Sequence, residues 1–246
     1  MRLAGKTAIV TGAASGFGAG IARRFAAEGA QVMVADLNMH AAHSVADEIG
    51  GIACEVDVSR DASVKAMVQA AQGAWGRIDI LVNNAGTTHL PKPMEEVSEE
   101  EFDRVLAVNA KSVYLCARHI VPLMKSAGTG AILNVASTAG VSPRPNLSWY
   151  NASKGWMITA TRAMAVELAP MGIRVNAINP VAGETPLLKS FMGEDTPEIR
   201  AKFLATIPLG RFSTPEDMAN AALFLCSDEA SMITGVAMEV DGGRCI

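Results

Sequence analysis

Tyr150 and Lys154 are four residues apart in the segment Trp149-Tyr-Asn-Ala-Ser-Lys154, and Ser137 lies thirteen residues before the tyrosine. In a helix, residues four apart share one face, so the Lys154 ammonium can approach the Tyr150 phenol. A neighbouring cation favours the phenolate and lowers the pKa of a tyrosine, ordinarily about 10. The pair is therefore predicted to act as a general acid/base that moves a hydroxyl proton. Many helices carry this spacing without any chemical role, so the rest of the chain has to support it.

Composition limits what kind of protein this is. The chain has 246 residues, 50% hydrophobic and 19% charged, which suits one α/β domain with a large core. A net charge of −4 predicts no nucleic-acid partner, and no apolar run approaches the ~18 residues of a membrane helix. The amino-terminal apolar stretch is too short for a secretory signal. The cysteines are scattered and lack metal-site spacing, so we expect the reduced thiols of a cytoplasmic protein and no metal: Cys54, Cys116, Cys226 and Cys245.

Short apolar runs alternate with helix-like segments along the whole chain. Runs without polar alternation are typical of parallel strands that are covered on both faces. Strand–helix alternation predicts an α/β fold with a doubly wound, seven-stranded parallel sheet in one domain spanning residues 1–246. The expected strands are Thr7–Val10, Val32–Ala35, Ile52–Val56, Ile78–Val82, Ala131–Val135, Val175–Ile178 and Val236–Val240.

The segment 182–208 breaks this alternation. It is rich in proline and glycine and follows the sixth expected strand, at the carboxyl edge of the sheet. Ligands bind at that edge in open α/β sheets. We expect the segment to be a lid over a substrate, the alternative being an ordinary surface insertion.

A glycine-rich turn follows the first strand and opens a helix: Thr11-Gly-Ala-Ala-Ser-Gly-Phe-Gly18. Its glycines let the backbone approach a pyrophosphate, and the helix amino terminus offers N–H groups to that anion. Asp36 ends the second strand, where a carboxylate binds ribose hydroxyls and repels a 2′-phosphate. No basic residue stands beside Asp36, and position 15 is serine, so the sequence predicts NAD rather than NADP. The alternative is that Asp36 only binds neighbouring backbone.

Two further segments are predicted to contact the same dinucleotide. Asp57 and Val58 follow the third strand, where the side chain of the first and the backbone of the second can contact adenine. Asn83-Asn-Ala-Gly86 follows the fourth strand. Asparagine side chains can pin the backbone of neighbouring strands, and Gly86 allows the chain to pass close to the cofactor.

These motifs occur together in an order that resembles one known family. The glycine turn, Asn83-Asn-Ala-Gly86, Asn109, Ser137, the Tyr150/Lys154 pair and Asn179-Pro180 stand at the spacings of short-chain dehydrogenases/reductases of about 250 residues. The resemblance covers Lys6 to Gly243 and implies a Rossmann-type fold. One departure concerns the loop after Pro180, where Val181 replaces the usual glycine and Gly183 replaces the usual isoleucine or valine.

The resemblance implies a role for each matched residue. Tyr150 is the acid/base, Ser137 holds the substrate oxygen, and Lys154 lowers the pKa of Tyr150 and binds the nicotinamide ribose. Asn109 distorts its helix and holds a water that connects Lys154 to solvent, and Thr185 holds the nicotinamide amide. The expected NAD contacts are Gly12, Ser15, Gly16, Phe17, Gly18, Asp36, Leu37, Asp57, Val58, Asn83, Ala85, Gly86, Tyr150, Lys154, Pro180, Gly183 and Thr185.

The resemblance implies that the substrate is an alcohol or its carbonyl, and the loops around the site suggest its class. The expected substrate contacts are His89, Arg144, Leu187 and Leu188. Apolar walls suggest an aromatic or cyclic alcohol, and the loops are similar to those of aryl-alcohol members of the family, hydroxymethylbenzenesulfonate dehydrogenases included. Cations at the cleft could attract an anionic substrate. The alternative is that Arg144 and Lys92 are solvated surface groups.

Two other functions are weighed against this one. Some family members are 3-oxoacyl-carrier-protein reductases, which generally use NADPH and need a basic patch for an acidic carrier. Asp36 and the negative net charge argue against that activity. The chain could also be a non-catalytic NAD-binding interaction protein, which the intact set of Asn109, Ser137, Tyr150 and Lys154 opposes. The family implies a homotetramer, and the apolar helix expected from Trp149 to Met171 is a candidate contact.

Overall fold

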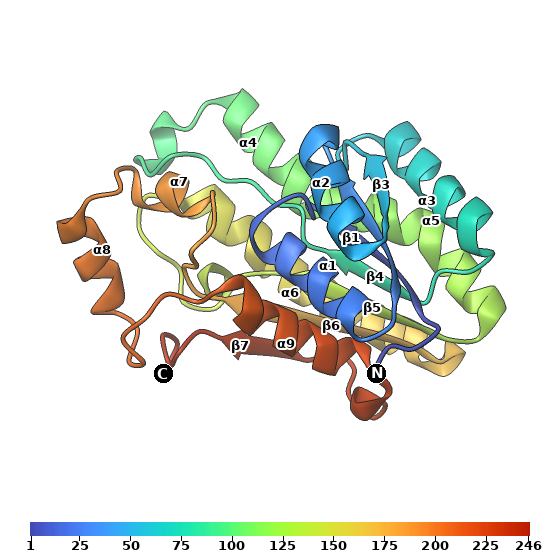
Figure 1. Ribbon diagram of the computed structural model, residues 1–246. Helices are drawn as coiled ribbons and strands as arrows, with labels where there is room; N and C mark the ends of the chain where they lie inside the picture. Colours follow the sequence, from blue (N-terminus) through green and yellow to red (C-terminus); the bar gives the residue numbers. More distant parts are fainter.

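The computed structural model describes residues 1–246 and contains one parallel sheet of seven strands in the order β3-β2-β1-β4-β5-β6-β7 (Figure 1). This is the doubly wound topology predicted from the sequence, and each expected strand is present within about two residues. The order reverses between β1 and β4, which leaves a crevice at the carboxyl ends of these neighbouring strands. The strands are β1 Thr7–Thr11, β2 Gln31–Asp36, β3 Ile52–Glu55, β4 Ile80–Asn83, β5 Gly130–Val135, β6 Ile173–Pro180 and β7 Ala237–Val240.

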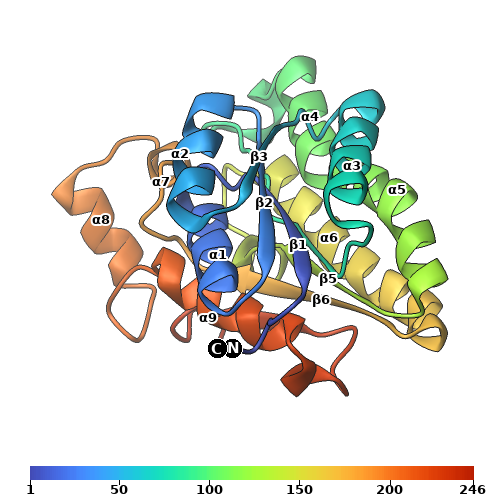
Figure 2. The ribbon, with the colours of Figure 1, turned by 45° about the vertical axis from the view of Figure 1, so that its right-hand side comes forward.

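Helices cover both faces of the sheet (Figures 1 and 2). On one face α1, α2 and α9 pack in a core around residues such as Phe25 and Leu223, and on the other face α3, α5 and α6 pack around residues such as Leu81 and Ile120. The helices are α1 Gly16–Ala27, α2 Met39–Ile49, α3 Asp61–Trp75, α4 Glu99–Leu106, α5 Ser112–Ala127, α6 Ser148–Leu168, α7 Leu188–Met192, α8 Pro197–Leu204 and α9 Pro215–Cys226.

The helix α6 begins one residue earlier and ends three residues earlier than expected. Pro170 falls in a short 3₁₀ turn, Ala169–Met171, which follows the α-helix because proline cannot continue it. The helix is not buried all around: Trp156 is 44% and Val166 81% exposed, while Met157 and Leu168 are buried. Its apolar outer face is therefore uncovered in the single chain.

The segment 182–208 lies beside the sheet and carries α7 and α8, which project to one side in Figure 1. It has a small hydrophobic cluster of its own, built from Val181, Leu188, Met192, Ile207 and Phe212. No helix is long and apolar enough to cross a membrane. No cluster of side chains has the composition of a metal site, and all four cysteines are free.

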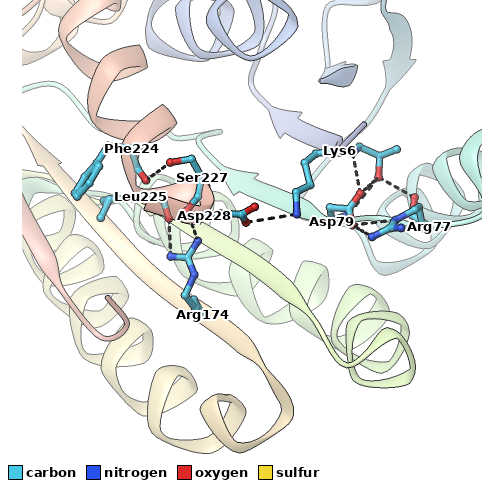
Figure 3. Close-up of polar contacts among 9 residues, drawn as sticks. Lys6, Arg77, Asp79, Arg174, Phe224, Leu225, Ser227 and Asp228 are labelled. Carbon is cyan, nitrogen blue, oxygen red and sulfur yellow. Dashed lines mark hydrogen bonds and ion pairs between the residues drawn. The ribbon is translucent and has the colours of Figure 1, made fainter. Parts of the chain in front are cut away.

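Polar side chains close the amino-terminal edge of the sheet (Figure 3). The buried Asp79 carboxylate accepts hydrogen bonds from the Thr7 backbone N–H at 2.9 Å and from Arg77 Nε at 2.9 Å. Arg174 at the start of β6 donates to the Leu225 carbonyl at 2.7 Å and to the Ser227 carbonyl at 3.1 Å. These carbonyls lie at the carboxyl end of α9, so the arginine satisfies groups that the helix leaves without partners.

Replacing Arg174 by methionine is expected to destabilise the protein by about 1–3 kcal/mol, because buried carbonyls of α9 lose charged donors. Urea unfolding followed by circular dichroism measures the change. The matched control is Arg162→Met, which removes an exposed arginine that forms no hydrogen bond or ion pair and is expected to change stability by less than about 0.5 kcal/mol. Equal stability of the two variants would contradict the capping role of Arg174.

Candidate active site

A cavity of about 590 Å³ opens at the carboxyl edge of the sheet, within the range of ligand sites. It receives residues from the ends of β1, β2, β4, β5 and β6, and from the start of α6. The segment 182–208 adds Ala182, Gly183, Thr185, Pro186, Leu187, Phe191 and Phe203 to its lining. The chain thus brings residues that are far apart in sequence to one edge, as the parallel topology requires.

The glycine turn is held tightly at one side of this cavity. A Cβ on Gly18 would lie 2.2 Å from the Gly12 carbonyl oxygen, so only glycine fits there. The Asn84 side chain donates to the carbonyls of Thr11 and Gly12, each at 2.9 Å. The first turn of α1 carries no acidic residue, and the side chain of its N-cap, Ser15, accepts none of the helix N–H groups. The turn therefore presents N–H groups that suit a bound phosphate.

Acidic residues from the neighbouring strands line the same cavity. The Asp36 carboxylate accepts from the Ala14 N–H at 3.0 Å and from the Asn38 N–H at 2.9 Å. Asp36 therefore binds the neighbouring backbone, as the alternative interpretation expected. It also lines the cavity, as the cofactor prediction expected. The Asp57 carboxylate accepts from the Ser59 backbone and hydroxyl, and its neighbour Val58 also lines the cavity. Exposed Leu37 completes this end.

Ser137, Tyr150 and Lys154 all line the cavity and are at most 9% exposed. The Lys154 Nζ donates to the Val135 carbonyl at 2.9 Å and lies 5.9 Å from the centre of the Tyr150 ring. The Ser137 Oγ accepts from the Ala139 N–H at 3.0 Å, and its hydroxyl also acts by a hydrogen bond on the Tyr150 phenol. The three side chains are thus gathered as the sequence predicts.

Burial controls the charge of these groups. It raises the pKa of Tyr150 to about 12, although the Ser137 hydroxyl and the Arg144 charge act in the opposite direction. It lowers the pKa of Lys154 to about 8. In the chain alone, desolvation of the phenolate outweighs the Ser137 hydroxyl and the Arg144 charge, so the phenol is not acidic without a ligand. Further positive charge or hydrogen bonding is needed beside the phenol.

Asn109 lies outside the cavity lining and is completely buried. It sits in a π-helical turn, Ala107–Lys111, between α4 and α5, which agrees with the distortion expected of this helix. Its Oδ1 accepts from the Thr87 N–H at 2.9 Å, and its Nδ2 donates to the Thr87 carbonyl at 2.9 Å and to the Ser153 Oγ at 3.0 Å. Asn109 thereby ties the chain after Gly86 to α6.

Two expected substrate residues do not reach the cavity. His89 is 1% exposed, and its Nδ1 lies 2.8 Å from the Leu90 carbonyl, so the ring is turned into the protein. Leu188 packs in the hydrophobic cluster with Met192 and Ile207. The other two, Arg144 and Leu187, line the cavity as expected.

Two expected cofactor residues, Asn83 and Gly18, do not line the cavity but hold the segments that form it. Asn83 is buried, and its Nδ2 donates to the Asn134 Oδ1 at 2.9 Å, which links β4 to β5. Gly18 is covered by the turn that it allows to form. The remaining expected contacts line the cavity: Gly12, Ser15, Gly16, Phe17, Asp36, Leu37, Asp57, Val58, Ala85, Gly86, Tyr150, Lys154, Pro180, Gly183 and Thr185.

The structure also adds lining residues that the sequence analysis missed. Phe203 from α8 and the exposed Arg104 from α4 border the cavity. No motif marks either residue, because each lies within a helix whose placement depends on tertiary packing. Asn84 is a third lining residue that the sequence analysis did not name. Its place beside Asn83 in the same motif could have identified it.

The unusual Gly183 is explained by its neighbour. A Cβ at this position would lie 2.2 Å from the Phe17 Cζ and 2.8 Å from the Ser213 Oγ. The Phe17 ring therefore occupies the space that a side chain at position 183 would need. Phe17 and Gly183 are 166 positions apart in the sequence, yet the large residue fills the space that the small one leaves. Both line the cavity.

Gly183→Ala is expected to destabilise the fold by about 1–3 kcal/mol, because the new methyl group overlaps the Phe17 ring. The double variant Phe17→Leu/Gly183→Ala is expected to recover most of that loss. Thermal unfolding measures both. Gly73→Ala, in open space on α3, is the control and is expected to leave stability unchanged or slightly higher. If the stability lost in the double variant equals the sum of the losses in Phe17→Leu and Gly183→Ala, the two positions are independent and the proposed packing of Phe17 against Gly183 is disproved.

Comparison with known proteins gives matches along the whole chain. A family model described as enoyl-(acyl carrier protein) reductase matches residues 12–244. A 4-formylbenzenesulfonate dehydrogenase of Comamonas testosteroni is 52% identical over 254 residues, covering 100% of both chains. A 2,5-dichloro-2,5-cyclohexadiene-1,4-diol dehydrogenase of Sphingobium indicum is 40% identical, covering 98% of this chain and 97% of that relative.

A solved structure also matches the chain over its whole length. The 3-ketoacyl-(acyl-carrier-protein) reductase of Brucella melitensis, complexed with NADH, superposes with a TM-score of 0.95 at 53% identity, covering 99% of this chain and 100% of that chain. Such similarity in sequence and in structure over the full length shows that the chain belongs to the short-chain dehydrogenase/reductase family.

Proposed function

We propose that the protein is an NAD-dependent oxidoreductase that interconverts an aromatic or cyclic alcohol and its carbonyl compound. The observation that carries this proposal is the joint position of Ser137, Tyr150 and Lys154 in the cavity that the glycine turn borders. Bound NAD would supply the hydride acceptor, and NADH the hydride donor. The residues that would hold it are the expected cofactor contacts that line the cavity.

Each catalytic side chain has a role that follows from its contacts. Ser137 donates its hydroxyl hydrogen to the substrate oxygen and orients it beside the Tyr150 phenol. Tyr150 takes the proton of an alcohol, or gives one to a carbonyl oxygen. Lys154, held by the Val135 carbonyl, keeps a positive charge in the cavity below its pKa of about 8. Together with the charge of an oxidised nicotinamide, this lowers the pKa of Tyr150 from its value in the free chain.

We propose that Asn109 positions this set. Its contacts with Thr87 and Ser153 fix the chain after Gly86 against α6, which carries both Tyr150 and Lys154. The π-helical turn also frees backbone carbonyls, which can hold the water expected to connect Lys154 to solvent.

Tyr150→Phe is expected to reduce turnover by at least about 1,000-fold, because no other side chain is placed to exchange the proton. The assay is NADH consumption with 4-formylbenzenesulfonate and with a panel of cyclic ketones. NADH binding, followed by its fluorescence, is expected to stay within about threefold of the wild type. Turnover near the wild-type rate in the variant would refute the acid/base assignment.

We propose NAD rather than NADP because Asp36 lines the cavity at the end of β2 with a carboxylate already fixed by two backbone N–H groups. A carboxylate held there is placed to accept hydrogen bonds from ribose hydroxyls, and its charge repels a 2′-phosphate. The next residue, Leu37, offers no cation in exchange.

Asp36→Arg is expected to reverse the cofactor preference, lowering kcat/KM for NADH and raising it for NADPH, each by about tenfold or more. Initial rates with both cofactors on one substrate measure the change. Asp47→Arg, which places the same charge change on α2, is the control. An unchanged ratio of the two cofactors in the Asp36 variant would show that another residue sets the preference.

The proposed substrate class rests on the cavity wall and on the relatives. Leu147, Leu187, Phe191 and Phe203 form an apolar and aromatic wall around Tyr150, with the Phe191 ring centre 5.0 Å from that of Tyr150. The named activities of the relatives from Comamonas testosteroni and Sphingobium indicum concern a substituted aromatic ring and a cyclic diol. We propose that the segment 182–208, which supplies three of the wall residues, acts as the substrate lid.

A carrier-protein substrate is the second candidate, because the Brucella melitensis neighbour is named as a 3-ketoacyl-carrier-protein reductase. Acetoacetyl carrier protein assayed with NADH and NADPH separates the two proposals. Faster turnover of that substrate than of any ring compound would favour the second. Absence of hydride transfer across the whole panel would instead favour a non-catalytic NAD-binding protein.

We further propose that the protein is a cytoplasmic homotetramer. The free cysteines support a reducing compartment. The exposed apolar residues Tyr114 on α5 and Trp156 and Val166 on α6 support a subunit contact. Sedimentation velocity measures the assembly, and a monomer at micromolar concentration would contradict it.

A further inference from the structure

Arg144 differs from the other cation considered near the site. Lys92 forms an ion pair with Glu101 at 2.9 Å and does not line the cavity. Arg144 lines the cavity, and none of the ion pairs of the chain includes it. The alternative of a solvated surface group therefore applies to Lys92 and not to Arg144.

The Arg144 guanidinium is held in place from the lid. Its central carbon lies 4.3 Å from the centre of the Phe203 ring, a cation–π contact from α8. This contact fixes the guanidinium plane but uses none of its N–H groups. The side chain is therefore oriented and still has donors available for a ligand.

A second arginine approaches the same loop from the carboxyl terminus. Arg244 donates from Nη1 to the Ser142 Oγ at 3.2 Å, two residues before Arg144, and its Nε is buried without a hydrogen-bond partner. Arg244 also forms no ion pair. The acid of this tail, Asp241, accepts from the backbone N–H groups of Gly243 and Cys245 and is engaged there.

We propose that Arg144, backed by Arg244, binds an anionic substituent of the ring substrate, a sulfonate or a carboxylate. This inference rests on the proposed function, because the substituent lies on the molecule whose oxygen meets Tyr150. Two like charges that act on each other in a half-buried place are unfavourable when neither has an ion-pair partner, and a bound anion offsets that repulsion. The lowered pKa of Arg144, caused by burial and by the Arg244 charge, agrees with this electrostatic cost.

The position of the two groups fits a substrate with its reacting and charged ends apart. Arg144 lines the same cavity as Tyr150 and is near enough to lower the pKa of that phenol. The planar guanidinium can give two parallel N–H bonds to a sulfonate or carboxylate. Each end of the cavity has an aromatic ring beside it: the Phe191 ring centre lies 5.0 Å from that of Tyr150, and the Phe203 ring centre lies 4.3 Å from the Arg144 guanidinium carbon.

The test compares two aldehydes of nearly equal shape, 4-formylbenzenesulfonate and 4-(methylsulfonyl)benzaldehyde, which differ in charge. The measured quantity is the ratio of their kcat/KM values with NADH. Arg144→Gln is expected to lower that ratio by roughly 10- to 100-fold, because a charge-assisted hydrogen bond is lost. The ratio cancels any general effect of the variant on Tyr150. Arg244→Gln is expected to give a smaller loss, and Lys92→Gln, the matched control, none.

A ratio that is equal in the wild type and in Arg144→Gln would overturn the anion site while leaving the dehydrogenase proposal intact. If neither aldehyde is turned over, the dehydrogenase proposal for aromatic substrates fails, and binding decides the anion site separately. Calorimetry then compares 4-methylbenzenesulfonate with methyl 4-tolyl sulfone on the NADH-loaded protein. Preference for the sulfonate that is lost in Arg144→Gln would support the site, and equal binding of both compounds would refute it.

Discussion

The buried ammonium of Lys154 is the group that the rest of the site is built to hold. It is 4% exposed, has no carboxylate partner, and donates to one protein acceptor, the Val135 carbonyl. Burying a charge without a counter-ion costs free energy, which is why its pKa falls to about 8. The end of β5 supplies the carbonyl, and α6 supplies the side chain.

The same burial acts on Tyr150 in the opposite sense and raises its pKa to about 12. In the chain alone the cavity therefore holds a neutral phenol beside a weakly basic amine. A ligand that brings positive charge near the phenol lowers its pKa, and one that brings negative charge to Arg144 offsets a repulsion. The two proposed ligands therefore act on different groups of the cavity, the nicotinamide charge on Tyr150 and an anionic substituent on Arg144.

The sequence predicts the sheet, the glycine turn and the shared position of Ser137, Tyr150 and Lys154 in one cavity, because each is encoded by local chemistry: apolar β-branched runs, glycines and a fixed helical spacing. It fails where the direction of a side chain in a loop decides its role. His89 and Leu188 stand within a few residues of lining positions but turn inward, and Asn83 bonds across the sheet while Asn84 faces the cavity. Arg144 and Lys92 differ in role because Glu101, on α4, forms an ion pair with the lysine and not with the arginine.

The loop after Pro180 shows why departures from a family pattern need a structure to be understood. The sequence alone places glycine at position 183, where a branched residue is usual, and leaves the path of the loop open. In the fold, the Phe17 ring fills the volume that the missing side chain leaves, and Thr185 still lines the cavity. Close packing couples the two positions, because a side chain at 183 would overlap the Phe17 ring as well as approach the Ser213 Oγ. Comparing the chain with the family pattern one position at a time therefore misses that the residues at 17 and 183 depend on each other.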